Sequence, residues 1–242
     1  MTLSYDPVDL DFLEDPYPTY AHLRDEDPVH HYAGTDEVPS FWALSRFTDI
    51  WAAVRSQKDF SSAQGLTFYP DEIDQLNLPP NLVMLDPPVH TQRRALIGRG
   101  FTSRRVTELE DIIRNFARRR LTELGERAAD GEDVDLHQEF SSTIPTYVLA
   151  ELFGLAEEDR HRFGPWVQAL TSIQNDGLRI GQLDGKGAVA EMLGYFSEQI
   201  KARRSEPADD LIGALVAAEI EGERLTDWDI LGFCFVVVAG GS

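Results

Sequence analysis

The sequence predicts a mainly helical protein with a small β-sheet near its N-terminus. Beyond residue 104, apolar residues recur at three-to-four spacing, which is the period of one helix face. The segment 39–47, PSFWALSRF, has the aromatic and apolar content of a strand. With 242 residues and 42% hydrophobic content, the chain can bury a sizeable core. The sequence shows neither a clean linker nor a repeat of fixed period, so we expect residues 1–242 to form a single domain.

The first elements form the order helix, sheet, helix. Residues 17–32, YPTYAHLRDEDPVHHY, indicate a short helix that breaks at Pro28, because proline cannot continue a helix interior. After the strand at 39–47, residues 49–60, DIWAAVRSQKDF, favour a helix with Thr48 as its N-cap.

A long loop is predicted between this helix and the next. Residues 61–88 contain five prolines and have mixed polarity, and a short helix is possible only near 71–76, DEIDQL. Loops of this length inside a compact domain are commonly functional.

One-sided helices account for the middle of the chain. Their apolar residues are Leu109, Ile112, Ile113, Phe116, Leu121 and Leu124, then Val148, Leu149, Leu152 and Phe153, and finally Val189, Met192, Leu193, Phe196 and Ile200. Between the last two groups, residues 170–186, LTSIQNDGLRIGQLDGK, contain three glycines and predict a break between helices.

The C-terminal segment 225–242, LTDWDILGFCFVVVAGGS, predicts a buried helix. Thr226 and Asp229 form a variant of the capping box, and the residues from Ile230 to Ala239 are apolar on every face. This apolar run is well short of the roughly 20 residues that a bilayer requires, so we expect it to cross the protein core. Gly240 and Gly241 then each cost about 1 kcal/mol relative to alanine, which indicates a close backbone approach or a helix distortion.

Composition excludes several function classes. The chain carries 42 acidic and 22 basic side chains, a net charge of −20, which disfavours non-specific binding to nucleic acid or to an anionic membrane. Cys234 is the only cysteine, so an internal disulfide framework or a thiolate zinc cluster is excluded. The acidic N-terminus lacks an apolar signal segment. These features predict a cytoplasmic location.

One segment departs from this acidic composition. Residues 85–106, LDPPVHTQRRALIGRGFTSRRV, contain five arginines within thirteen residues, and no acid occurs between Asp86 and Glu108. If a helix begins after Pro88, His90 and Arg94 share one face, where the helix N-terminus also favours an anion. Arg94 could hold a carboxylate-bearing ligand through its planar guanidinium. Without other context, a solvated helix face is the commoner explanation of an isolated His/Arg pair of this kind.

Taken together, several motifs identify the chain as a relative of a known family. FSSAQG at 60–65, the segment 85–106, RRSEPADDLIGALV at 203–216 and the glycine pair at 240–241 occur in the order and spacing of soluble bacterial cytochromes P450. The sequence resembles that family over its whole length. The resemblance implies the cytochrome P450 fold, of which this chain is the N-terminal part and ends inside the long central helix.

The resemblance also implies a cofactor and its contacts. It implies heme b (iron protoporphyrin IX), with His90 and Arg94 bound to the haem propionates. Gly240 and Gly241 match the start of the oxygen-binding signature, in which Ser242 is the variable residue and an acid and a threonine follow beyond the chain end. The axial cysteine of the family is not in this chain, and Cys234 is expected to be a small core residue. We therefore expect the gene to continue with that signature and, much later, the cysteine loop.

The implied activity is insertion of one oxygen atom from O2 into a small hydrophobic substrate, with electrons from NAD(P)H through a ferredoxin reductase and a ferredoxin. The loops 66–84 and 170–183 and the central helix would face the substrate, through Val83, Met84, Leu170, Ile173, Gly232, Val236 and Ala239. An acidic ferredoxin would dock on Arg93, Arg99, Arg104 and Arg105. The alternative is a non-enzymatic helical protein that binds an acidic partner through residues 90–105.

Overall fold

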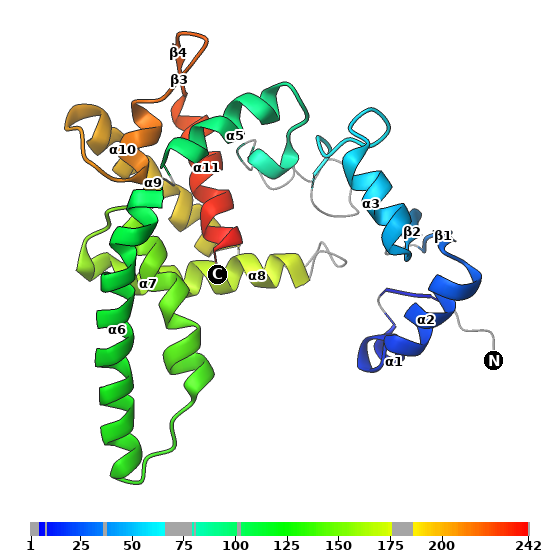
Figure 1. Cartoon of the computed structure of the whole chain (residues 1–242), viewed down its shortest axis with the longest axis horizontal. Helices are drawn as coiled ribbons and strands as arrows, with labels where there is room; N and C mark the ends of the chain where they lie inside the picture. The colour runs from blue at the N-terminus through cyan, green and yellow to red at the C-terminus, as the bar shows by residue number, and fades with distance from the viewer. Residues whose placement is uncertain are drawn as a thin grey trace.

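The structure is a computed structural model that describes residues 5–7, 9–35, 38–65, 79, 81–100, 103–175 and 186–241. It confirms a mainly helical fold with a small N-terminal sheet (Figure 1). The N-terminal elements are α1 (Leu10–Glu14), α2 (Tyr17–Glu26), β1 (Val29–Tyr32), β2 (Phe41–Leu44) and α3 (Phe47–Arg55).

The two N-terminal strands form an antiparallel pair, with Val29 opposite Leu44 and Tyr32 opposite Phe41. Helix α2 ends at Glu26, before Pro28, as the sequence predicts. The third helix begins earlier than predicted, because its N-cap is Arg46 rather than Thr48, and Arg46 provides no side-chain cap.

A tertiary contact explains this earlier start. The Arg46 guanidinium donates to the carbonyl oxygens of Arg24 at 2.7 Å and Asp25 at 3.2 Å, near the end of α2. This contact fixes the residue that precedes α3. Thr48 therefore lies inside the first turn of the helix, and the prediction that it is the N-cap is wrong.

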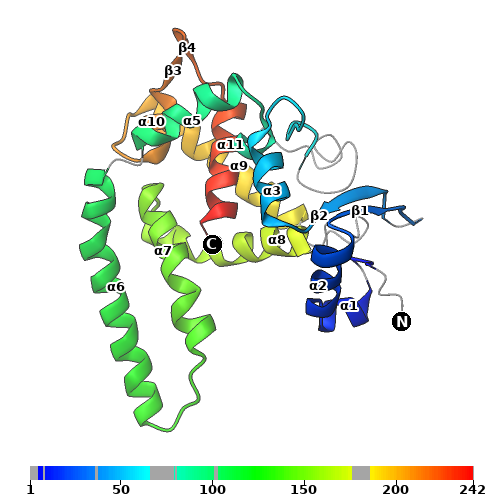
Figure 2. The same cartoon turned by 45° about the vertical axis from the view of Figure 1, so that its right-hand side comes forward.

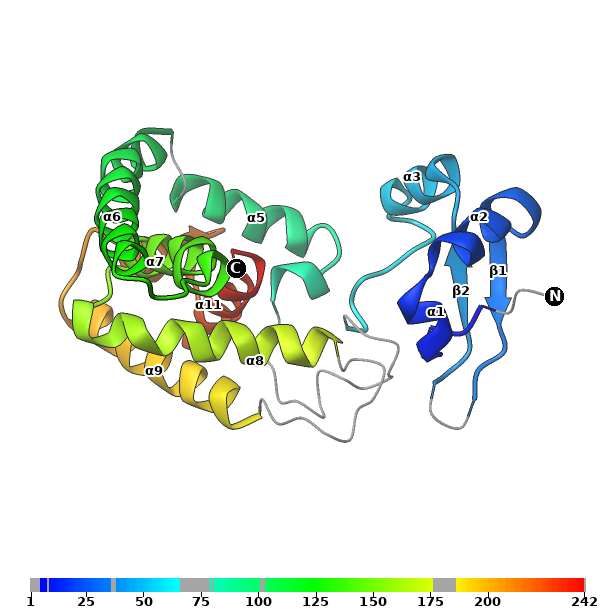
Figure 3. The ribbon, with the colours of Figure 1, turned by 90° about the horizontal axis from the view of Figure 1, so that it is seen from below.

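The remaining elements form a helical body beside the N-terminal part (Figures 1 and 3). They are η1 (Leu82–Met84), α5 (Val89–Gly100), α6 (Ser103–Ala129), the π-helical η2 (His137–Ser141), α7 (Thr143–Leu152), η3 (Glu157–Arg162), α8 (Phe163–Asn175), α9 (Lys186–Ser205), α10 (Leu211–Val216), the hairpin strands β3 (Glu219–Ile220) and β4 (Glu223–Arg224), and α11 (Asp227–Gly240). Helices α6 and α7 lie side by side (Figure 2). The predicted break at 170–186 begins too early, because α8 continues to Asn175, and residues 176–185 lie outside the described residues.

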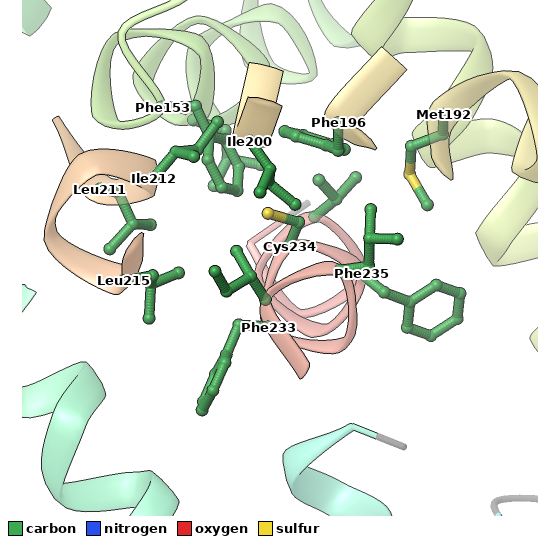
Figure 4. Close-up of a cluster of buried hydrophobic side chains, with 14 of the residues drawn as sticks. Phe153, Met192, Phe196, Ile200, Leu211, Ile212, Leu215, Phe233, Cys234 and Phe235 are labelled. Carbon is green, nitrogen blue, oxygen red and sulfur yellow. The ribbon is translucent and has the colours of Figure 1, made fainter. Parts of the chain in front are cut away.

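Helix α11 runs through the hydrophobic core, as its apolar sequence predicts. Phe233, Cys234 and Phe235 are buried on different faces of the helix, and Figure 4 shows around them side chains from α9 and α10 and that of Phe153, directly after α7. Next to this cluster, the rings of Phe153 and Phe196 lie 4.8 Å apart, within the usual range for aromatic pairs. The capping box is formed: Thr226 and Asp229 exchange bonds between side chain and backbone.

Several predicted features fall outside the described residues. These are the short helix at 71–76, most of the predicted substrate loops, and Ser242. Within the helices, the structure gives the backbone but not the side chains of residues 97–100, 103–105, 171–175 and 186. Among the described helices, none is long and apolar enough to cross a membrane.

Candidate functional site

The start of α5 is anchored to the loop before it by Asp86. The Ser61 hydroxyl donates to Asp86 Oδ2 at 2.5 Å, and the Ser62 N–H donates to Asp86 Oδ1 at 3.0 Å. These two bonds hold the pKa of Asp86 below its usual value. The backbone oxygen of Asp86 accepts from the His90 N–H at 3.0 Å, which begins the helix. The motifs at 60–65 and 85–106 are thus joined directly, a link that sequence reasoning missed.

His90 and Arg94 lie one turn apart on α5, as predicted. His90 is half-buried in the first turn, whereas Arg94 is exposed. Within the part of the chain that the structure describes, Arg94 has no salt-bridge partner. A half-buried imidazole and a free guanidinium one turn apart suit a ligand with one or two carboxylates. This donor set fits the propionates of a haem.

Arg93 lies in a different environment from Arg94. Its guanidinium Nη2 is 2.5 Å from Asp229 Oδ1, near the start of α11, and the two side chains are 18% and 16% exposed. Arg93 is therefore an internal link between α5 and α11, and it does not lie on an exposed partner surface as the sequence predicted. The backbones of Arg99, Arg104 and Arg105 lie at the end of α5 and the start of α6, while their side chains are outside the described residues.

The two glycines at the end of α11 have different surroundings. A Cβ built on Gly241 would lie 2.8 Å from Leu149 Cδ2 and 2.9 Å from the Val237 oxygen, so this position is packed against α7. A Cβ built on Gly240 would meet no described atom within 4 Å. Gly240 therefore presents bare backbone on an open face, where a small ligand could approach the helix closely.

Cys234 does not belong to this site. Its side chain is fully buried in the core around α11, and burial raises the pKa of its thiol. A buried neutral thiol of this kind is a poor metal ligand, which agrees with the prediction of a core residue. A thiolate ligand for a haem would have to come from residues outside these 242.

The predicted substrate-facing residues divide by burial. Met84 and Leu170 are 2% and 4% exposed within the main hydrophobic cluster, and Gly232 is also buried. Val83 is 45% exposed, and Val236 and Ala239 are half-buried on α11. The side chain of Ile173 is outside the described residues. Every one of these positions is apolar or glycine, and none supplies a charge.

The motif at 203–216 forms a buried ion pair between Arg203 and Asp210. The Arg203 guanidinium donates to Asp210 Oδ2 at 2.8 and 3.0 Å and to the Gly154 oxygen at 3.0 Å. Asp210 Oδ1 also accepts from the Gly213 N–H at 2.7 Å, which caps α10. This network joins α9, α10 and the turn after α7, so the motif is structural in the part of the chain described.

Comparisons with known proteins identify the class of this fold. No protein-family profile matches the sequence. Cytochrome P450 130 of Mycobacterium tuberculosis is 42% identical over 233 residues, which are 94% of this chain and 56% of that protein. The vitamin D(3) 25-hydroxylase of Pseudonocardia autotrophica is 33% identical over 238 residues, 95% of this chain and 55% of that protein.

Solved structures agree with these relatives. A cytochrome P450 of Mycobacterium marinum, CYP268A2 in complex with pseudoionone, matches with a TM-score of 0.78 at 27% identity. The alignment covers 99% of this chain and 61% of the CYP268A2 chain. CYP109Q5 of Chondromyces apiculatus matches with a TM-score of 0.75 at 29% identity, in an alignment that covers 96% of this chain and 55% of the CYP109Q5 chain. The fold is that of a cytochrome P450. The chain belongs to the bacterial cytochrome P450 family and spans a little more than half the length of these relatives.

Proposed function

We propose that the intact protein is a haem-thiolate monooxygenase that inserts one oxygen atom from O2 into a small hydrophobic substrate. The observation that carries the proposal is that half-buried His90 and the exposed guanidinium of Arg94 lie one turn apart on α5, within a cytochrome P450 fold. Heme b, when bound, supplies the oxygen chemistry, and the protein supplies binding and orientation.

The role of α5 in this proposal is to hold the cofactor. His90 and Arg94 would each bind a propionate, and the helix dipole at the start of α5 adds a favourable field for negative charge. His90 would donate a ring N–H to the carboxylate.

The role of α11 in this proposal is to leave room for dioxygen and to exclude water. Gly240 offers backbone without a side chain on an open face, which suits the approach of dioxygen. The apolar residues before it, among them Val236 and Ala239, would keep bulk water from that face. Proton delivery would require polar groups beyond the glycine pair, because the described end of α11 carries none.

The substrate proposed is hydrophobic because the candidate residues are apolar or glycine. The same seven positions named from the sequence, Val83, Met84, Leu170, Ile173, Gly232, Val236 and Ala239, include no charge and no hydrogen-bonding side chain. Apolar linings with few polar groups are typical of sites for small organic molecules.

For electron supply, we propose a ferredoxin and its NAD(P)H-dependent reductase. The acid-free segment that ends in Arg99, Arg104 and Arg105 would attract an acidic protein to a chain whose net charge is −20.

The haem-binding step is tested with Arg94→Ala in the full-length protein. The change removes a charge-assisted hydrogen bond of roughly 1.5 to 3 kcal/mol, so haem occupancy after purification should fall. Arg104→Ala is the matched control and should keep its haem. Occupancy is measured by the Soret band, and its shift with carbon monoxide tests for a thiolate ligand. A colourless, folded wild-type protein that binds an acidic partner would instead support the non-enzymatic alternative.

A further inference from the structure

We infer that Arg93 is a positioning residue, which sets the orientation of His90 and Arg94 by tying α5 to the start of α11 through Asp229. This inference rests on the proposed haem site. It concerns a residue that does not itself bind the cofactor, and it follows from three observations about the pair.

The first observation is that the contact lies inside the structure. Arg93 Nη2 and Asp229 Oδ1 are 2.5 Å apart, and both side chains are more than four-fifths buried. Leu96, three residues further along the same helix, is 6% exposed in the main hydrophobic cluster. Residues three apart lie on neighbouring positions of one helix face, so Arg93 and Leu96 together form the inward side of α5.

The second observation is that bonds to Thr226 fix the Asp229 carboxylate independently of Arg93. Its Oδ2 accepts from the Thr226 N–H at 3.1 Å and from the Thr226 hydroxyl at 2.6 Å. The Asp229 N–H donates back to the Thr226 hydroxyl at 3.1 Å. One carboxylate oxygen therefore caps α11 and the other binds Arg93. Because the cap fixes the carboxylate, the ion pair transmits the position of α11 to α5.

The third observation is the angular relation on α5. At 3.6 residues per turn, His90 lies about 60° and Arg94 about 100° from Arg93, both in the same sense around the helix axis. Fixing Arg93 on Asp229 therefore fixes the direction of the His90–Arg94 face. A second contact, from the Gln92 amide to Glu221 at 2.8 Å, links α5 to the β3–β4 turn but is exposed.

Loss of the pair would leave one charge largely desolvated without a partner. Helix α5 would then turn or shift to bring that charge to water. The inward packing of Leu96 opposes the movement, and the pair His90 and Arg94 would lose its alignment. The expected result is faster release of haem from a protein that still folds.

The experiment is a double-mutant cycle in the full-length haem protein. Haem transfer to excess apomyoglobin is followed by the Soret band for wild type, Arg93→Met, Arg94→Ala and the double variant. We expect Arg93→Met to release haem about tenfold faster than wild type, as for residues that orient ligands of a metal centre. We expect the double variant to release haem more slowly than the product of the two single effects predicts, because part of the effect of Arg93 is exerted through Arg94 and is already lost in Arg94→Ala.

Two further variants keep the test decisive. Asp229→Asn preserves an acceptor for the Thr226 cap but removes the charge, and it should also release haem faster even if Arg93→Met fails to fold. Arg114→Met removes an exposed pair with Glu110 on α6 and should release haem at the wild-type rate.

The possible outcomes separate the inference from the proposed function. Wild-type haem release rates in Arg93→Met and Asp229→Asn would overturn the inference. It would also be overturned if the fold-change in release rate of the double variant equals the product of the fold-changes of Arg93→Met and Arg94→Ala. A wild-type protein that binds no haem would instead contradict the proposed function.

Discussion

At the scale of single residues, Gly154 shows how a buried network restricts a backbone position. Gly154 has φ of +63°, a conformation that side chains disfavour, and a Cβ built there would lie 2.5 Å from Asp210 Oδ2. The same carboxylate binds Arg203, whose guanidinium also donates to the Gly154 oxygen. The turn after α7 and the ion pair therefore occupy adjoining space that leaves no room for a methyl group.

We predict that Gly154→Ala destabilises the protein by about 1 to 3 kcal/mol, because it combines a strained φ with a clash against a buried ion pair. Gly194→Ala is the matched control: Gly194 lies within α9, and its Cβ would meet no described atom within 4 Å. That change should raise stability by up to about 1 kcal/mol through helix propensity. Urea unfolding of both variants measures the difference, and equal midpoints would contradict the packing described.

At the scale of elements, the helix boundaries show what the sequence could predict. Helix α11 was predictable because its capping box and its apolar run are both local patterns, and both are confirmed. The start of α3 was not, because Arg46 is fixed by carbonyls of α2 that lie more than twenty residues earlier. Local sequence patterns therefore predict a helix boundary when neighbouring residues cap it, and fail when a distant contact decides it.

The candidate site divides in the same way. His90 and Arg94 were predictable because their relation is one helical turn. The bonds from Asp86 to Ser61 and from Asp229 to Arg93 were missed because each joins residues far apart in sequence. An acid immediately before two prolines and an acid in a capping box were the available signals, but neither identifies its distant partner.

The attachment of the loop to α5 should depend on pH. The pKa of Asp86 is lowered by the Ser61 hydroxyl and the Ser62 N–H, so the ionised form is favoured in the folded state. A lowered folded pKa means that this contribution is fully present above the ordinary aspartate pKa and is lost as the pH falls through the lowered value. The Ser62 amide resonance, followed by NMR from neutral to acid pH, should report a transition below the ordinary aspartate range.

Asp86→Asn is the control for this titration. The asparagine can still accept from the Ser62 N–H but does not ionise, so the same amide resonance should lose that transition. A transition in the wild-type protein at or above the ordinary aspartate pKa would contradict the bonding described for Asp86.

At the scale of the whole molecule, charge is distributed unevenly. Many arginines beyond the acid-free segment pair with acids: Arg127 with Glu132 and Glu139, Arg162 with Glu191, Arg204 with Asp227. Residues 87–107 contain no acid of their own, and Arg93 finds its partner only in Asp229 on another helix among the residues described. In the sequence, the remaining arginines of the segment place positive charge in a stretch without acids, on a molecule with a net charge of −20.

This distribution predicts how an acidic ferredoxin should reduce the full-length protein. At a distance the net negative charge repels the partner, but within about 10 Å, the screening length in 0.1 M salt, the local arginines dominate. If docking uses Arg99, Arg104 and Arg105, the rate constant for reduction at low ferredoxin concentration should fall as ionic strength rises.

Arg105→Glu should lower that rate constant and weaken its dependence on salt. Arg114→Glu changes the net charge equally on the same helix, at an exposed side chain, and should have the smaller effect. Stopped-flow measurements over a range of salt concentrations would test this. A rate constant that rises with salt would show that overall repulsion governs the encounter, and it would move the docking site away from these arginines.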